Sequence, residues 1–267
     1  MTREVYCQLQ LDVDDTSRLV VQVAVAKHPG AQVEEELSFL LDGVHREPTE
    51  LASPHRGRVH VLDCPRGHLE ITYAATVSGE ADQVGEEPLD RVTYLRPSRY
   101  AESDRLAAVA AAEFGYLRGQ AELLASVSSW VGARLDYVAG SSGPTDGAVD
   151  TLIARTGVCR DYAHLVVALL RAMDVPARLV AVYAPGLSPM DFHAVAEALV
   201  DGHWQVVDAT LLAPRNSLVR ISTGRDAADT AFLSNYGGAV YLQSTEVRAV
   251  VVGNLPVEDV TRLVRLS

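Results

Sequence analysis

Cys159 is the residue of this sequence best suited to nucleophilic chemistry. It stands in the segment Thr156-Gly-Val-Cys-Arg-Asp-Tyr-Ala-His164, at the start of a run whose apolar residues keep helical spacing. The unpaired amides and positive dipole end of a helix N-terminus stabilise an anion, so a thiolate in the first turn is favoured as a nucleophile. The alternative is that Cys159 is one more small buried apolar residue, a common fate of free cysteine.

A thiolate nucleophile needs a base that takes up a proton and later returns it, usually a histidine oriented by a third polar group. His193 and Asp208 can supply this pair from a predicted β-hairpin. If Val200 and His203 flank a tight turn, His193 faces Thr210 on the opposite strand. Asp208 is then a diagonal neighbour of His193 on the same face, within reach of its side chain.

Three other residues compete for these roles. His164 follows Cys159 on the same helix, where a hydrogen bond on the helix face is the better interpretation. His203 lies at the hairpin turn, which predicts a solvated side chain. Asp161 lies in the first helical turn, where its charge interacts favourably with the dipole, and it is too close to the helix to orient a histidine on a strand.

The elements that must position these residues fall into two regions. From residue 3 to about residue 78, apolar and polar residues alternate, as around Leu9 and Leu11, which predicts strands. Turns rich in Pro and Gly, including Cys64-Pro-Arg-Gly67, suit antiparallel hairpins. We therefore interpret residues 1–95 as an antiparallel β domain, with two layers that form a β-sandwich.

Residues 96–267 are expected to form a second, catalytic domain. Apolar residues at spacings of three and four predict helices in its first part, and period-2 patterns predict strands later. The expected helices are 103–114, 119–138, 148–155 and 158–173, and the expected strands are 178–183, 193–200 and 204–208. Helices followed by strands in this way make the fold class α+β.

Segments across this chain resemble the transglutaminase-like superfamily of papain-type thiol enzymes. The segments are Gly157-Val-Cys-Arg-Asp-Tyr-Ala-His-Leu165, Val175-Pro-Ala-Arg178, Phe192-His-Ala194 and Trp204-Gln-Val-Val-Asp-Ala-Thr210. Leu95-Arg-Pro-Ser-Arg-Tyr100 and the β-rich first third also resemble the bacterial two-domain members, which include cysteine proteases. The resemblance implies a papain-like core with Cys159 as the nucleophile, His193 as the base and Asp208 as the orienting carboxylate.

The resemblance also implies acyl chemistry on an amide bond of a peptide or protein substrate, through a thioester. The oxyanion that forms needs two donors. The Cys159 amide is the natural first donor, and Tyr137, at the end of the predicted 119–138 helix, is a candidate second whose alternative is plain packing. Hydrolysis is favoured over transamidation because water is the default acceptor. The alternative function is a catalytically inactive peptide-binding or assembly module on the same fold.

Two positions depart from the pattern of the superfamily. Ala194 follows the histidine where many members have tryptophan, and Ala209 follows the aspartate where many have proline. Neither change removes a catalytic atom, but both open the floor around His193. The segment Gly224-Arg-Asp-Ala-Ala-Asp229 resembles one that borders the cleft in the bacterial members, and its simpler interpretation is a capped helix start.

A metal site has weak support in the sequence. His55, His60, Cys64 and His68 lie close together, but their spacing fits no established zinc motif, so a solvated hairpin is the better interpretation. The phosphate-binding glycine loop, the dinucleotide-binding glycine motif and the zinc-protease motif do not occur in the sequence. We expect neither a metal nor a cofactor.

Composition narrows the partners and the compartment. The 267 residues are 48% hydrophobic and 22% charged, which is typical of a globular protein. The net charge of −12 disfavours nucleic acid and anionic lipid as partners. The sequence shows no export signal and no apolar run long enough to span a membrane, and its three cysteines form no C-x-x-C pair. We therefore expect a cytoplasmic protein with reduced thiols, whose oligomeric state, including a homodimer, is left open.

Overall fold

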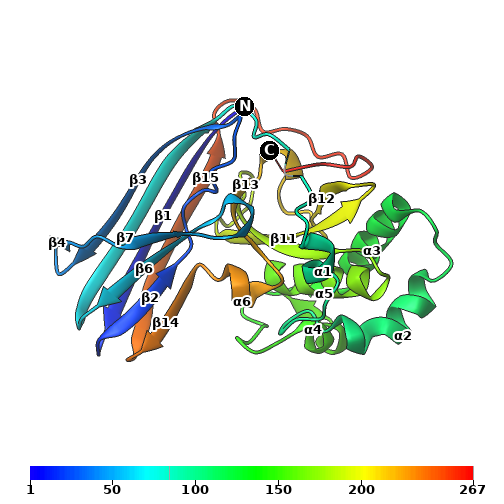
Figure 1. The fold of residues 1–267 in the computed structure, drawn as a ribbon, viewed down its shortest axis with the longest axis horizontal. Coiled ribbons are helices and arrows are strands. Elements are labelled where there is room, and N and C mark those ends of the chain that lie inside the picture. Colours follow the sequence, from blue (N-terminus) through cyan, green and yellow to red (C-terminus); the bar gives the residue numbers. More distant parts are fainter. Residues whose placement is uncertain (84, 267) are drawn as a thin grey trace.

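The computed structural model describes residues 1–83 and 85–266, and it has a β-sandwich on one side and a helical half on the other (Figure 1). Period-2 alternation forms the sandwich strands as expected. In β1 (Thr2–Val13), every second side chain from Arg3 onward is buried, and β7 (Gly67–Ser78) repeats the pattern. Each strand therefore has one apolar face, and the two sheets bury these faces against each other.

The sandwich consists of two antiparallel sheets. The first has the strand order β15-β1-β7-β3-β4 and the second has the order β14-β2-β6-β5. Fully buried side chains such as Leu9, Leu69 and Ile71 fill the space between them. The remaining strands are β2 (Ser17–Val21), β3 (Gln32–Leu41), β4 (Val44–His45), β5 (Thr49–Ala52), β6 (Arg58–Cys64), β14 (Leu233–Gly237) and β15 (Val240–Val251).

Two expectations about the sandwich are wrong. Strand β15 pairs with β1 and β14 pairs with β2, so residues 233–251 belong to the sandwich and not to a second domain that runs unbroken over 96–267. Most side chains of β15 are exposed, so its sequence lacks the alternation that marks the other long strands. The turn at residues 64–67 joins β6 to β7, which lie in different sheets, so it crosses the sandwich and forms no hairpin.

The second half is built around a buried helix. Helix α5 (Cys159–Ala172) packs against the sheet β12-β11-β10-β13 and is covered by α2, α3 and α4. Its strands are β10 (Ala177–Tyr183), β11 (Phe192–Val200), β12 (His203–Val207) and β13 (Val219–Gly224). The other helices are α1 (Asp90–Tyr94), α2 (Ser103–Phe114), α3 (Gln120–Arg134), α4 (Ala148–Ala154) and α6 (Ala227–Thr230), with single 3₁₀ turns at Pro54–Arg56 and Arg215–Ser217.

The structure confirms the α+β class, and it corrects one helix. Helix α3 ends at Arg134, where the chain becomes extended, and residues expected to continue it form β8 (Asp136–Tyr137). This strand pairs in parallel with β9 (Thr156–Gly157), immediately before α5. The sequence suggests helix here because the apolar spacing continues past the last turn, whereas the backbone hydrogen bonds are made with a distant segment.

The two halves share one continuous core. One buried cluster joins the sandwich strands to Tyr183 of β10 and to Val219 and Ile221 of β13. The Tyr183 hydroxyl donates to the Val23 carbonyl at 2.7 Å. The sandwich is therefore packed against the sheet that carries the candidate base. Among the described residues, no helix is long and apolar enough to cross a membrane.

A buried charge network lies in the β12-β11-β10-β13 sheet. The Glu197 carboxylate is 1% exposed, and it accepts from Arg178 Nε at 2.8 Å and from Arg220 at 2.6 Å. The Arg178 guanidinium also lies 3.7 Å above the Trp204 ring. These contacts compensate for the cost of removing three charges from water.

Glu197→Gln should destabilise the fold strongly, because it leaves two guanidinium groups buried without a countercharge. We expect a loss of about 3–5 kcal/mol in the free energy of unfolding, measured by urea denaturation. Asp63→Asn is the matched control, because it removes an exposed carboxylate partner from Arg18. It should leave the unfolding midpoint almost unchanged. An equally small effect of both variants would contradict the argument.

Candidate active site

Cys159 occupies the first turn of α5, as the sequence indicates. The helix begins there because the Asp161 carboxylate accepts from the amide of Val158, the residue before the helix, at 2.8 Å. Cys159 is partly exposed, whereas Cys7 and Cys64 are buried. Burial raises the pKa of the Cys7 thiol to about 11 and also raises that of Cys64. Of the three cysteines, Cys159 is thus the one that reagents and substrates can reach.

The loop at residues 140–147 is tied to the start of α5. The Ser142 hydroxyl donates to the second oxygen of Asp161 at 2.9 Å. Arg160 donates to the Gly143 carbonyl at 2.9 Å and to the Ser142 hydroxyl. Asp161 therefore holds the helix start and the loop together, which confirms that it does not orient the histidine.

The hairpin that carries His193 has the predicted register. Val200 pairs with His203, and the turn residues Asp201 and Gly202 have φ values of 50° and 78°. His193 Nε2 lies 2.7 Å from Asp208 Oδ2, and both residues are 2% exposed. The expected contact between His193 and Asp208 is present, but β12 ends at Val207, so Asp208 and Thr210 lie in the loop after the strand and not opposite His193 within the sheet.

The electrostatics of this pair favour a charged imidazole. Burial alone would lower the pKa of His193, but the Asp208 carboxylate, together with the nearby Cys159, raises it to about 10. Burial would raise the pKa of Asp208, and the contacts with His193 and Thr210 lower it overall. His193 Nδ1 is buried and has no hydrogen-bond partner among the described residues. At neutral pH, Nε2–H therefore donates to Asp208 while Nδ1–H is free to serve a reacting atom.

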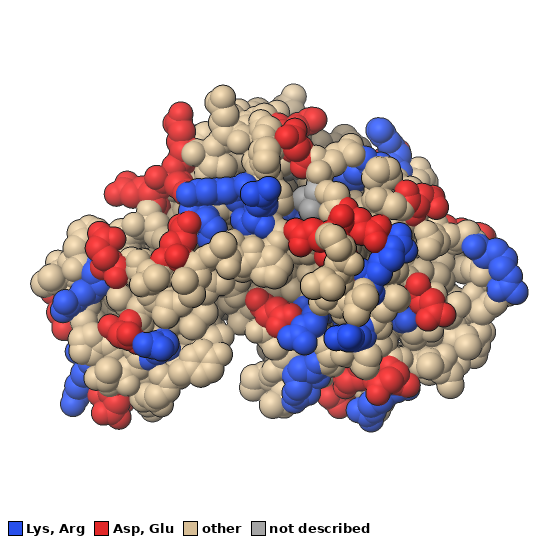
Figure 2. Space-filling view, viewed as in Figure 1, with Lys and Arg blue, Asp and Glu red and all other residues tan. Residues whose placement is uncertain are grey.

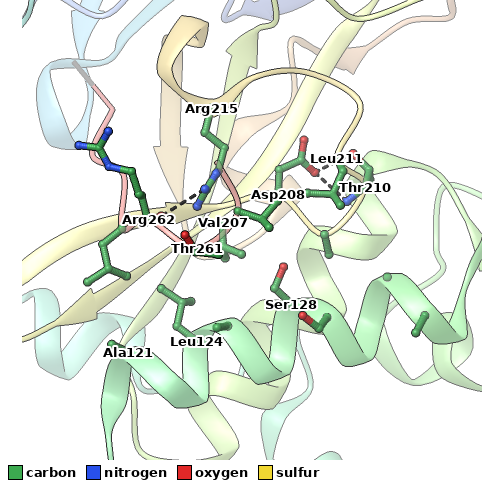
Figure 3. A pocket seen from close by; sticks show the side chains of 17 residues that line it. Ala121, Leu124, Ser128, Val207, Asp208, Thr210, Leu211, Arg215, Thr261 and Arg262 are labelled. Carbon is green, nitrogen blue, oxygen red and sulfur yellow. Dashed lines mark hydrogen bonds between the residues drawn. The ribbon is translucent and has the colours of Figure 1, made fainter. Parts of the chain in front are cut away.

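Asp208 is itself held in place (Figure 3). Its Oδ1 accepts from the Thr210 amide at 2.9 Å and from the Thr210 hydroxyl at 2.6 Å. Helix α3 approaches this loop closely at Gly132, where a Cβ atom would lie 2.7 Å from the Ala209 carbonyl oxygen. Thr210 and Gly132 are supports of Asp208 that were not predicted from the sequence. Thr210 lies two residues after Asp208, the spacing of a local turn in which an aspartate side chain accepts from the backbone, whereas the contact with Gly132 joins distant segments and has no local signal.

Two cavities adjoin the pair and differ in what lines them. The one in Figure 3 has a volume of about 460 Å³ and lies between α3, the loop after β12 and residues 260–263. It is lined by Asp208 but by neither Cys159 nor His193. The second has a volume of about 200 Å³ and is lined by both Cys159 and His193, so it is the candidate reaction cleft.

The segment that precedes β14 borders this cleft, as expected. Helix α6 is capped by Asp226, whose carboxylate accepts from the Ala228 amide at 2.9 Å. Ala227 and Thr230 of this helix line the cleft, together with Gln22 from the sandwich half. Both interpretations of residues 224–229, a capped helix and a cleft border, are therefore confirmed.

In Figure 2, acidic and basic side chains are interspersed over the face shown, which is notched between the two halves.

Tyr137 lies beside Cys159, although it belongs to β8 and not to a helix. Its backbone pairs with Gly157, and its side chain is 44% exposed. Partial burial and the neighbouring Cys159 thiol raise the pKa of the phenol to about 12, and the Cys159 amide, which donates toward the phenol oxygen, opposes the rise. The two groups expected to stabilise an oxyanion are therefore adjacent.

His164 and His203, the two alternatives to His193 as the base, have surroundings different from those of His193. His164 is fully buried, accepts from the Ala227 amide at 3.1 Å, and stacks on Tyr100 with ring centroids 5.4 Å apart. Burial is the main cause that lowers the pKa of His164 to about 3. His203 is exposed at the hairpin turn. Neither residue lines the cavity that contains Cys159 and His193.

Buried neutral His164 should make the protein sensitive to acid. Its pKa is lower in the folded state than the unfolded value of about 6.5, so the unfolded chain binds more protons below that pH. Stability should therefore fall as the pH drops from about 6.5, by up to about 1.4 kcal/mol per pH unit from this residue. Urea denaturation of wild type and His164→Gln measures the difference in slope, and parallel pH profiles would contradict it.

The four residues that gave the weak sequence signal for a metal site, His55, His60, Cys64 and His68, do not come together in the structure. His60 bonds to Glu50 and His68 bonds to Asp12, while Cys64 is buried in the sandwich core. The expected solvated hairpin is wrong for His55, His60 and Cys64, which are buried, and right for His68. His60 and Cys64 lie on the buried face of β6, whereas His55 lies in the 3₁₀ turn at Pro54–Arg56 and contacts Tyr94 and Arg178.

His55 instead lies near Glu87 and Asp90, with one ligand atom from each within 4.8 Å of the others. The Arg178 guanidinium contacts both ring nitrogens of His55 at 3.1 and 3.2 Å. Burial, and then Arg178, lower the pKa of His55 to about 3. The same positive charge opposes a metal ion at this position.

Comparison with known proteins places these features in a family context. Residues 110–209 match the profile of the transglutaminase-like superfamily. A protein from Cytophaga hutchinsonii, whose crystal structure is described as that of "a Putative Cysteine Protease", is 30% identical to this chain in sequence. The two structures superpose with a TM-score of 0.88, and the match covers 97% of this chain and 93% of that one. An uncharacterised Mycobacterium leprae protein is 24% identical over 208 residues, which are 67% of this chain and 73% of that protein.

Proposed function

Because this chain belongs to the transglutaminase-like superfamily, we propose that it is a thiol enzyme that cleaves an amide bond in a peptide or protein substrate. Cys159 is the nucleophile, His193 the general acid and base, and Asp208 the group that orients and charges the imidazole. The observation that carries the proposal is the buried 2.7 Å pair of His193 and Asp208 beside the partly exposed Cys159.

The first half of the reaction forms a thioester. The Cys159 thiolate attacks the amide carbonyl, and the oxyanion accepts from the Cys159 amide and the Tyr137 phenol. The carbon–nitrogen bond then breaks as the His193 imidazolium donates the Nδ1 proton to the leaving amine. The free Nδ1 position of His193, and the carboxylate that keeps this ring charged, support this role.

The second half returns the enzyme to its starting state. The neutral His193 takes a proton from water, the hydroxide attacks the thioester carbonyl, and the carbon–sulfur bond breaks to release a carboxylic acid and the thiolate. Water is present at the concentration of the solvent, so hydrolysis is favoured over transamidation.

Mass spectrometry of the products tests hydrolysis directly. A peptide substrate is incubated with the enzyme in the presence of methylamine, and an acid quench traps any acyl group on Cys159. A thioester adduct that decays mainly to the free acid supports the proposal. Decay mainly to the N-methylamide would show a transamidase, and the absence of both adduct and cleavage would favour a peptide-binding module.

Tyr137→Phe should reduce turnover by removing one donor from the oxyanion. A lost oxyanion donor costs about 100-fold in kcat at the low end of measured cases, while substrate binding changes little. The measurement is kcat and KM for wild type and variant on the same peptide. Tyr116→Phe, another exposed phenol, is the matched control. A variant with unchanged kcat would mean that Tyr137 only packs against Cys159.

A further inference from the structure

We infer that the cleft binds an apolar side chain on the acyl side of the scissile bond, so that the preferred substrates carry an aliphatic or aromatic residue within two positions of the attacked carbonyl. This inference rests on the proposed function. It starts from the cavity of about 200 Å³ that is lined by Cys159 and His193. Pockets for whole small molecules measure roughly 300–1,000 Å³, so this one matches a single side chain.

One wall of the cavity is made by small and apolar residues of the β12-β11-β10-β13 sheet. Ala181 on β10 and Ala194 on β11 are cross-strand partners, and Leu179 lies two residues before Ala181 on the same strand. An alanine pair at this place leaves room that larger side chains would fill. The space next to His193 is therefore open and lacks polar groups of its own.

Aromatic residues where this sheet meets the sandwich also line the cavity. Phe232 and Phe192 stack with ring centroids 4.9 Å apart and an interplanar angle of 22°. Both rings pack against the sandwich core, and Ile221 of that core also lines the cavity. The junction between this sheet and the sandwich core thus adds apolar surface to the cavity.

The polar side chains around the cavity are already engaged. The Gln22 amide nitrogen donates to the Asp229 and Ala231 carbonyls at 3.1 and 3.2 Å. The Thr230 hydroxyl donates to the Asp226 carbonyl at 3.3 Å.

Arg160 and Asp191, the charged residues of the lining apart from His193, also have partners. Arg160 is held by the loop at residues 140–147, as described above. Asp191 accepts from the Phe192 amide at 2.7 Å and is exposed at the rim. A polar substrate group inside the cavity would therefore lose water and find few free partners there, whereas an apolar one gains from burial.

The acyl fragment is the part of the substrate that such a pocket can serve throughout the reaction. It stays covalently attached through both steps, while the amine leaves after the first and water must enter for the second. A side chain held between Phe232 and the alanine pair keeps the thioester carbonyl in position for water. The acyl side is therefore favoured over the leaving side.

Active-site probes of matched size test the inference. Peptidyl chloromethyl ketones alkylate a thiolate at the position of the substrate carbonyl, and norleucine and glutamine side chains are similar in length but differ in polarity. We vary these two residues at each of the two positions next to the reactive group and follow Cys159 by mass spectrometry. Rates are divided by the iodoacetamide rate of the same protein.

The norleucine probe should react at least about tenfold faster than the glutamine probe at one of these positions. Equal rates, or faster glutamine, would overturn the inference while leaving the thiol enzyme intact. A Cys159 that is inert to iodoacetamide as well would instead overturn the proposed function.

Filling the pocket supplies the second arm of the test. Ala194→Leu should reduce the norleucine preference toward unity, whereas Ala125→Leu, an exposed position on α3, should keep it. If Ala194→Leu does not fold, Phe232→Ala serves instead, because it enlarges the pocket and should shift the preference from norleucine to phenylalanine. An unchanged preference in a folded pocket variant contradicts the inference.

Discussion

Cys159→Ala should abolish cleavage, with a loss of about a millionfold in kcat, because the variant has no atom to form the thioester. The free energy of unfolding should change little, since Cys159 is partly exposed. The measurement is peptide cleavage at high enzyme concentration, together with a urea denaturation curve for each protein.

Cys64→Ser is the control for loss of a thiol as such. Cys64 is buried in the sandwich, and its sulfur donates to the Pro65 carbonyl at 3.4 Å, a contact that a serine hydroxyl can keep. This variant should retain kcat even if it is less stable. Residual cleavage in Cys159→Ala above about a thousandth of the wild-type rate would assign the reaction to another group.

Asp208→Ala should lower kcat by about ten-thousandfold, the scale seen when the orienting carboxylate of a triad is lost. Burial lowers the pKa of His193 and the Asp208 carboxylate is the main group that raises it, so the variant imidazole becomes neutral at neutral pH. Proton NMR of the His193 ring follows this change independently of activity. A ring that stays charged would contradict the assigned role.

Asp208→Asn separates orientation from charge. Its side-chain oxygen can still accept from His193 Nε2–H, but it carries no charge, so activity should fall between the values for wild type and Asp208→Ala. Thr210→Val gives a milder test, because it removes the hydroxyl that donates to Asp208 at 2.6 Å. If both aspartate variants lose the same activity, the charge matters more than the geometry.

The site could be predicted from the sequence because its parts are local. Cys159 starts a strongly periodic helix, and the register of one tight hairpin determines how His193 faces Asp208. Sequence spacing within a helix and across a hairpin is governed by regular geometry. The same is true of the alternating strands of the sandwich.

Features that join distant segments could not be predicted in this way. Strand β15 returns to pair with β1 at the other end of the chain, and few of its side chains are buried. Gly132 matters because α3 packs against the Ala209 carbonyl, a contact that no spacing indicates. The wall that Phe232 adds to the cleft likewise depends on how the two halves pack.

The role of the sandwich follows from that packing. It pairs with the C-terminal strands, shares its core with the sheet that carries His193, and borders the cleft at Gln22. It is therefore a structural part of the candidate active site. We propose that the two halves of this chain act as one catalytic unit.

The central claim is that Cys159 and His193 form an activated pair, and the pH dependence of iodoacetamide alkylation tests it most directly. Mass spectrometry reports the rate at Cys159 in wild type and in His193→Ala, with buried Cys7 and Cys64 as internal references. An ordinary thiol reacts slowly below its pKa of about 8.5. We predict that wild-type Cys159 still reacts rapidly near pH 6 and that His193→Ala loses this reactivity. Identical profiles that follow an ordinary thiol in both proteins would contradict the account.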